Sequence, residues 1–192
     1  MAGLSGPFVK TTYYYRYRER CRFCGKIVEK SAPEGEAMVR DLKTLILGRR
    51  EWVALPELGL SAVKAKVDTG ARTSALHAEN IEIFGSGAGR RVRFVVHPLI
   101  EEAELAVPCE AVLRDVRDVT CSNGERESRP VIVTRLRVGA RTWPIEIGLT
   151  NRDGLQHRML LGRQAIQPGM LVDPTRSFLL PRLGARLYRT PA

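Results

Sequence analysis

Apolar and polar side chains alternate along much of the chain from Thr44 onward, which is the period of a half-buried β-strand. In Ala62–Asp68 the apolar side chains face one way, and Lys64 and Lys66 face the other. The same period recurs in Arg91–His97, Val131–Val138 and Thr142–Thr150. These four stretches therefore predict strands, each with one buried face.

Turn-forming residues separate the predicted strands, with glycine at most of these positions. Many short strands at near-regular spacing are typical of a closed barrel or a sandwich. Only Arg163–Ile166, directly after Gly162, has a short helical pattern. The sequence thus predicts an all-β fold with one short helix.

The first forty residues differ from the rest of the chain. Tyrosines at 13–15 and 17 are interleaved with arginines, and neither period is sustained. We expect residues 1–40 to be a flexible or loosely structured basic extension and residues 41–192 to be the barrel domain. The tract of tyrosine and arginine has the side chains that stack on bases and neutralise phosphates. Without an RNA-binding fold around it, nucleic acid is not an expected partner.

The 192 residues carry 31 Lys and Arg against 21 Asp and Glu, a formal net charge of +10. Such a surface attracts anions such as nucleic acid or acidic peptides. The charge fits equally well with a basic face that is only exposed to solvent. No apolar run reaches the ~20 residues of a membrane span, and the N-terminus lacks a secretory apolar region. We expect a cytoplasmic protein without membrane attachment.

The sharpest local motif is Asp68-Thr69-Gly70-Ala71, at the end of a predicted strand. A carboxylate held at a strand end can act on a substrate, and Gly70 lets the backbone turn tightly beside it. The alternative is an Asx turn, in which Asp68 only binds its own chain. The tetrapeptide alone leaves both readings open.

A second motif, Leu160-Leu161-Gly162-Arg163, follows about ninety residues later. The pair of motifs resembles the retropepsins, the aspartic peptidases of retroviral type, in which such an apolar-Gly segment supports the Asp-Thr-Gly loop. The fuller runs Leu45–Val53 and Lys64–Ala78 are similar to one bacterial group within that family. It was formerly labelled "ATP-dependent zinc proteases" and is often encoded beside RimK-type glutamate ligases. The resemblance spans about Leu45–Ala185.

The resemblance implies a retropepsin-like closed barrel that acts as a homodimer. In an aspartic peptidase two carboxylates share one proton and activate a water. The chain contains only one Asp-Thr-Gly, so two subunits would each supply one Asp68. Thr69, Gly70 and Ala71 would shape the catalytic loop. The supporting loop would be Leu160, Leu161, Gly162 and Arg163.

A retropepsin also closes a hairpin flap over its substrate. The best tip here is Ser122-Asn123-Gly124, because Asn-Gly favours a tight hairpin turn, and the return strand would begin at Arg129. An ordinary surface hairpin is the alternative. Many retroviral enzymes pair the arginine of Gly-Arg with an acidic residue soon after Asp-Thr-Gly. Arg72 and Thr73 stand in that region here, so the partner of Arg163 stays open.

The histidines do not predict a catalytic zinc. The chain has only His77, His97 and His157, without a His-Glu-x-x-His motif. Cys21 and Cys24 make half of a zinc knuckle and are read as reduced thiols, and Cys109 and Cys121 as small core residues. No metal and no cofactor is expected.

The predicted function is that of an aspartic endopeptidase. A water between two Asp68 carboxylates would hydrolyse peptide bonds, with acidic or glutamate-tailed peptides as substrates suited to the basic chain. The alternative is a catalytically silent retropepsin-like scaffold that binds or regulates a glutamate ligase or a ribosomal partner.

Overall fold

The computed structural model describes residues 16–20, 27–31, 44–120, 126–154 and 156–188. Contacts divide the chain into two units, Met1–Leu42 and Lys43–Ala192. In the first unit, β1 (Arg16–Arg20) and β2 (Ile27–Ser31) pair as an antiparallel hairpin. Cys21, Cys24 and Cys121 lie outside the described residues. That residues 1–40 form a flexible extension stays a prediction.

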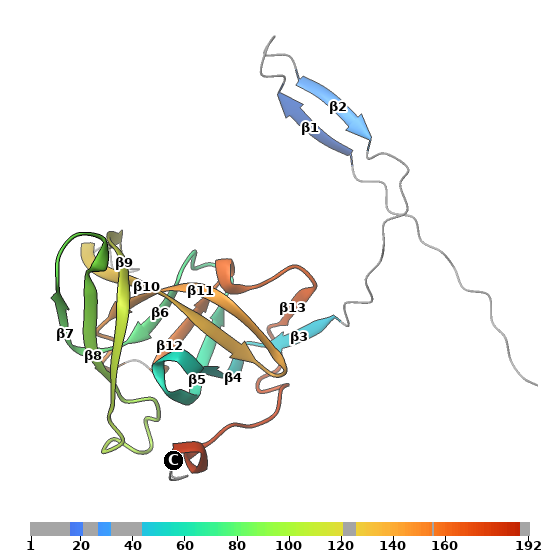
Figure 1. Ribbon diagram of the computed structural model, residues 1–192. Helices are drawn as coiled ribbons and strands as arrows, with labels where there is room; N and C mark the ends of the chain where they lie inside the picture. Colours follow the sequence, from blue (N-terminus) through green and yellow to red (C-terminus); the bar gives the residue numbers. More distant parts are fainter. Residues whose placement is uncertain (1–15, 21–26, 32–43, 121–125, 155, 189–192) are drawn as a thin grey trace, which may run out of the picture. The chain divides into compact units, whose positions relative to one another are not determined.

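The second unit is an all-β domain, drawn in Figure 1. One sheet has the strand order β11-β6-β12-β5-β4-β10-β9-β8-β7, and β11 also pairs with β10. The first six strands of this order therefore close into a barrel. The strands of the domain are β3 (Leu45–Gly48), β4 (Arg50–Leu55), β5 (Leu60–Asp68), β6 (Ser74–His77), β7 (Glu79–Phe84), β8 (Arg91–Val96), β9 (Val107–Thr120), β10 (Arg126–Val138), β11 (Arg141–Thr150), β12 (Met159–Gly162) and β13 (Met170–Asp173).

All four strands predicted from alternation are present, as β5, β8, β10 and β11. In β5 the side chains of Val63, Ala65 and Val67 are buried in the core, and Lys66 is exposed on the outward face. The barrel core joins apolar side chains from every barrel strand, which stabilises the fold because their surface leaves water. The prediction of an all-β closed barrel is confirmed.

The helical turn predicted after Gly162 forms as the 3-10 helix η3 (Arg163–Ala165). Three other single-turn 3-10 helices are present: η1 (Pro56–Leu58), η2 (Gly87–Gly89) and η4 (Ala185–Tyr188). The described residues contain no α-helix, and none of their helices is long and apolar enough to cross a membrane.

Two long strands, β9 and β10, extend from the barrel as an antiparallel hairpin. β7 and β8 continue the sheet beyond β9, and Figure 1 shows these three strands at one side of the barrel. The predicted flap tip, Ser122-Asn123-Gly124, lies outside the described residues. Whether this hairpin is a flap stays a prediction.

Buried polar groups anchor the C-terminal segment to the barrel. Glu51, which is fully buried, accepts hydrogen bonds from the backbone N–H groups of Gly48 (2.7 Å) and Leu179 (3.0 Å). The hydroxyl of Tyr188 accepts from the N–H of Ala62 (2.9 Å) and donates to the carbonyl of the same residue (2.7 Å). These bonds fix residues far apart in sequence against β4 and β5.

Candidate functional site

Asp68 is the last residue of β5, and its side chain lies on the outward face of that strand, as Lys66 does. Its Oδ1 atom accepts the backbone N–H groups of Gly70 (3.0 Å) and Ala71 (3.2 Å). Oδ2 lies 3.9 Å from the Nζ atom of Lys66. The two readings of the sequence therefore do not exclude each other. Oδ1 of Asp68 holds an Asx turn, and Oδ2 is left outside that turn.

The supporting segment lies directly behind this loop. β12 runs parallel to β5, with Leu161 beside Val67 and Gly162 beside Asp68. The N–H of Gly162 donates to the hydroxyl of Ser74, at 3.2 Å. A Cβ atom on Gly162 would lie 2.5 Å from the backbone of Thr73, closer than side chains approach. Only glycine fits at this contact between the two segments.

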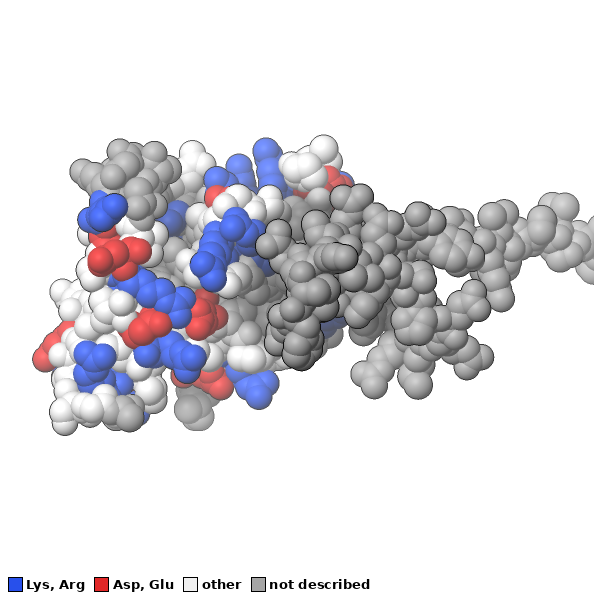
Figure 2. Space-filling view, turned by 90° about the horizontal axis from the view of Figure 1, so that it is seen from above, with Lys and Arg blue, Asp and Glu red and all other residues white. Residues whose placement is uncertain are grey.

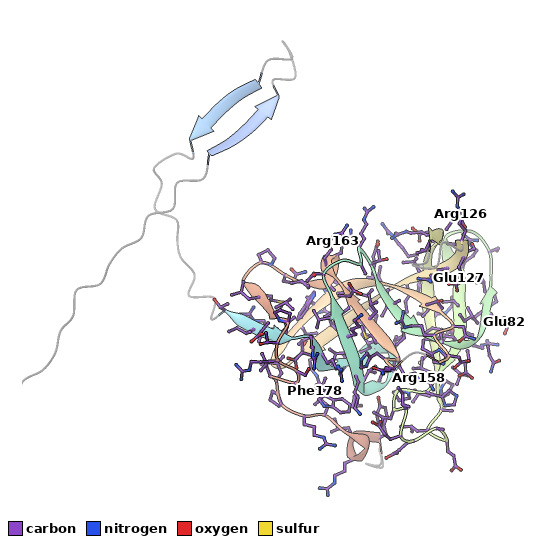
Figure 3. The ribbon with its side chains drawn as sticks, turned by 180° about the vertical axis from the view of Figure 1, so that it is seen from behind. Glu82, Arg126, Glu127, Arg158, Arg163 and Phe178 are labelled. Atoms are coloured by element: carbon purple, nitrogen blue, oxygen red, sulfur yellow. The ribbon has the colours of Figure 1, made fainter. Side chains whose placement is uncertain are left out.

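Arg163 ties the two segments together. Its Nη1 atom donates to the carbonyl of Gly70 (2.8 Å), and its backbone N–H donates to the carbonyl of Ala71 (2.9 Å). The partner left open by the sequence is thus a backbone carbonyl of the Asp68 loop, with no acidic side chain required. Figure 3 shows Arg163 and Arg158 at opposite ends of β12.

Thr69 follows Asp68 in the loop, and its proposed part in shaping the loop stays a prediction. It is exposed, and the structure gives its hydroxyl no hydrogen bond within the described residues. The N–H groups of the turn are taken by the Asp68 carboxylate. The structure thus brings Asp68, Gly70 and Ala71 together with Leu161, Gly162 and Arg163, while Leu160 pairs with Lys66 one step earlier along β5. Their catalytic roles stay predictions.

The other predicted residue, Arg129, lies near the start of β10. Its Nε atom donates to Glu127 (2.8 Å), and Glu127 also accepts from the hydroxyl of Thr150 at 2.7 Å. The pKa of Arg152 is lowered first by burial and then by the positive charge of Arg129, and Asp68 opposes the shift. Arg152 therefore lies near enough to both Arg129 and Asp68 to respond to their charges.

Sequence reasoning missed the segment 151–158, which enters the site between β11 and β12. The ring of His77 holds it: Nδ1 accepts the N–H of Arg152 (2.9 Å), and Nε2 lies 3.0 Å from Glu79. His77 is fully buried. No local signal in the sequence marks this anchor, because His77 and Arg152 are 75 residues apart.

His77, Glu79 and Asp153 form a cluster whose ligand-type atoms lie within 4.8 Å of one another. The chemistry of His77 argues against a metal there. Since Nδ1 accepts a backbone N–H, the neutral ring carries its proton on Nε2, and that N–H points to Glu79. The nitrogen that faces the cluster therefore has no free lone pair. We assign no metal to it.

Comparison with known proteins places this geometry in a family. Residues 46–182 match the family model RimB-like, described as "Retropepsin-like aspartic endopeptidase RimB". A probable alpha-L-glutamate ligase of Shewanella pealeana is 45% identical over 139 residues, which are 72% of this chain and 30% of that protein. A protein of the same description from Desulfotalea psychrophila is 42% identical over 137 residues, 71% of this chain and 30% of that one.

This chain thus spans about a third of the length of these curated relatives. Among solved structures, a Legionella pneumophila protein described as of unknown function is 31% identical. The match covers 70% of this chain and 97% of that one, with a TM-score of 0.58. The similarity therefore concerns the barrel domain.

Proposed function

We propose, on the premise that the chain belongs to the RimB-like family of retropepsin-like aspartic endopeptidases, that it hydrolyses peptide bonds with Asp68. The observation that carries the proposal is the oriented carboxylate. One oxygen of Asp68 is fixed by two loop N–H groups, and the loop is buttressed by Gly162 and Arg163. A catalytic group has to be held in this way to meet its substrate without reorganising.

The chemistry requires a second carboxylate. With one Asp-Thr-Gly in the chain, we propose a homodimer in which each subunit supplies one Asp68. The pair shares one proton, because two carboxylates in contact do not both ionise. The exposed position of Thr69 and Gly70 at the loop surface leaves this part of the domain open to a second copy.

The reaction follows from the shared proton. The ionised carboxylate removes a proton from a bound water, whose oxygen attacks the carbonyl carbon of the peptide bond. The protonated carboxyl polarises the carbonyl oxygen, and a tetrahedral diol forms. Its collapse breaks the C–N bond, and the amine leaves with a proton from the dyad. Water is consumed and the dyad ends as it began, without a metal or cofactor.

The substrates we propose are acidic peptides, including glutamate tails. The support is the net charge of +10 and the basic surroundings of Asp68. The relatives' description as probable alpha-L-glutamate ligases supports a setting in which glutamate is ligated, and cytoplasmic location fits that setting.

The test compares Asp68→Asn with Asp173→Asn on a peptide library. Asp173 is the last residue of β13 and, like Asp68, accepts hydrogen bonds from the turn that follows it, here from Thr175, so its substitution is a matched loss of one carboxylate. We expect Asp68→Asn to lose at least about 10³-fold in hydrolysis with an unchanged unfolding temperature, since an amide cannot act as the base. Full activity of Asp68→Asn would refute the aspartic mechanism.

A second candidate rests on the names of the relatives. Because their matched segment is 30% of proteins described as probable glutamate ligases, the barrel is one part of a larger chain there. A catalytically silent barrel that binds or regulates a RimK-type glutamate ligase or a ribosomal partner is the alternative. A dimer that cleaves no peptide at any pH, yet changes the activity of such a ligase, would favour it.

A further inference from the structure

A basic cavity of about 360 Å³ opens beside Asp68, lined by Arg49, Arg50, Lys66, Arg152, Gln156 and His157. Lys66 belongs to both places: it lines the cavity, and its Nζ atom is 3.9 Å from Oδ2 of Asp68. The register places Arg50 of β4 directly opposite Lys66 of β5. Arg152 and His157 come from the segment that His77 anchors. An occupant of this cavity therefore lies next to the reacting group.

Three of the four cations of the cavity have no counter-charge nearby among the described residues. Within the described part of the chain, Arg49, Arg50 and Arg152 have no carboxylate in salt-bridge distance, and the Lys66–Asp68 contact is long. Lys64, two residues earlier on the same face of β5, is paired with Glu101. Figure 2 shows the ordinary case, in which basic and acidic side chains alternate over the described surface. The cavity thus gathers several basic side chains, of which only Lys66 has a carboxylate within salt-bridge distance among the described residues.

The pKa of His157, which lines the cavity, responds to the same positive charges. Burial lowers the pKa of His157, and Arg50, Lys66, Arg152 and Lys64 lower it further, in that order. Its Nδ1 atom is buried and has no hydrogen-bond partner among the described residues. Several cations border one small space, which is the arrangement of a site for an anion.

We propose that this cavity binds the side-chain carboxylate of the substrate residue that flanks the scissile bond, with Arg50 and Arg152 as the specificity-determining residues. The inference rests on the proposed function and makes it more specific. Arg50 and Arg152 can each donate two N–H groups to a carboxylate, and Lys66 lies between them and Asp68. A side chain bound there positions its own peptide bond at the dyad. Acidic specificity is then local, and is not only long-range attraction by net charge.

The binding test uses the full chain with Asp68→Asn, so that the ligand is not consumed. The probe is an N-acetylated, C-terminally amidated oligoglutamate peptide, and oligoglutamine is its uncharged counterpart. Because both ends are blocked, binding reports side chains and not a terminal carboxylate. We expect the glutamate peptide alone to bind by calorimetry. We also expect it to raise the pKa of His157, followed by NMR, because an anion then faces the ring.

The variants Arg50→Gln and Arg152→Gln, each in this background, should weaken binding about 10-fold or more, as expected for a lost charge-assisted hydrogen bond. Arg93→Gln removes the same charge from β8, where the side chain is 57% exposed and 3.7 Å from Glu82. We expect less than about a twofold effect there. An equal loss in Arg93→Gln would mean diffuse attraction and overturn the inference. Equal binding of the two peptides, or displacement by inorganic phosphate as readily as by glutamate, would overturn it too.

Hydrolysis by the unmutated Asp68 chain separates this inference from the proposed function. Cleavage that needs Asp68 but shows no preference for glutamate beside the scissile bond would overturn the cavity assignment alone. Selective binding of oligoglutamate at His157, with no hydrolysis of any peptide, would overturn the peptidase proposal and leave in place only the assignment of the cavity as a site for a glutamate carboxylate.

Discussion

Two segments face each other across the candidate site, and they are held in different ways. The Asp68 loop is fixed through backbone atoms: its carbonyls and N–H groups bond to Arg163 and to the Asp68 carboxylate. The segment between β11 and β12 is held by His77 through its ring, which accepts the N–H of Arg152, and through its backbone N–H, which donates to the carbonyl of Arg158 (2.7 Å). Arg152 and His157 of this segment line the cavity. The first arrangement acts on the backbone of the loop itself, through the side chains of Asp68 and Arg163 and the backbone N–H of Arg163. The second holds the backbone of the segment, so the side chains that line the cavity can be substituted without breaking these bonds.

The largest expected effect comes from breaking the backbone contact. Gly162→Ala places a Cβ atom 2.5 Å from the backbone of Thr73, and neither strand can yield without moving the Asp68 loop. We expect a loss of about 3 kcal/mol in the free energy of unfolding, measured by urea denaturation. Gly89→Ala is the matched control, because its Cβ meets nothing within 4 Å and should change stability by less than about 0.5 kcal/mol.

A smaller effect is expected from the side-chain anchor. His77→Leu removes the acceptor of the Arg152 N–H and should cost about 2 kcal/mol in unfolding free energy. His77→Asn offers an oxygen where Nδ1 stands and should lose about half as much. The same denaturation experiment checks both. Similar losses in the two variants would mean that packing, and not the hydrogen bond, holds the segment.

Arg163→Met should have a milder effect, because it removes one exposed hydrogen bond and leaves the backbone bond of residue 163 intact. We expect about 1 kcal/mol in stability. Hydrolysis should fall more steeply than stability, since the bond orients the Asp68 loop. Hydrogen exchange of the Gly70 and Ala71 amides would report the loosening, and unchanged exchange would argue against this role.

The smallest effect is the pH dependence contributed by His157. Its pKa is lowered on folding by burial and by the nearby cations. The unfolded chain therefore binds a proton more readily below about pH 6.5, and stability falls as the pH drops through that window. His157→Gln should flatten the slope of unfolding free energy against pH there, with little change above about pH 7. An unchanged slope would contradict the shift.

Much of the barrel could be predicted because the signals for its strands lie in short, continuous stretches of the sequence. Alternation in β5, β8, β10 and β11 specifies which face is buried, and Gly162 follows an apolar pair as a supporting segment requires. What could not be predicted depends on distant partners. The sequence alone would place Glu51 at the surface. In the structure it is buried, and its carboxylate accepts the backbone N–H groups of Leu179 and Leu180, which lie far along the chain.

The basic cavity is the intermediate case. The alternation in β5 puts Lys66 on the same face as Asp68, so this one basic residue of the cavity could be placed from the sequence. Arg50 and Arg152 are about a hundred positions apart, and only closure of the barrel brings them together. The tip of the proposed flap and the role of residues 1–40 stay predictions.

The most direct test of the shared dyad mixes the unmutated chain with Asp68→Asn after joint refolding. At a fixed amount of unmutated chain, a ninefold excess of the variant leaves about a tenth of these chains paired with each other, if assembly is random. Hydrolysis should fall by the same factor, while Asp173→Asn in equal excess should not lower it. Hydrolysis that is unaffected by the Asp68→Asn excess would mean that one Asp68 suffices, and the two-subunit account would be wrong.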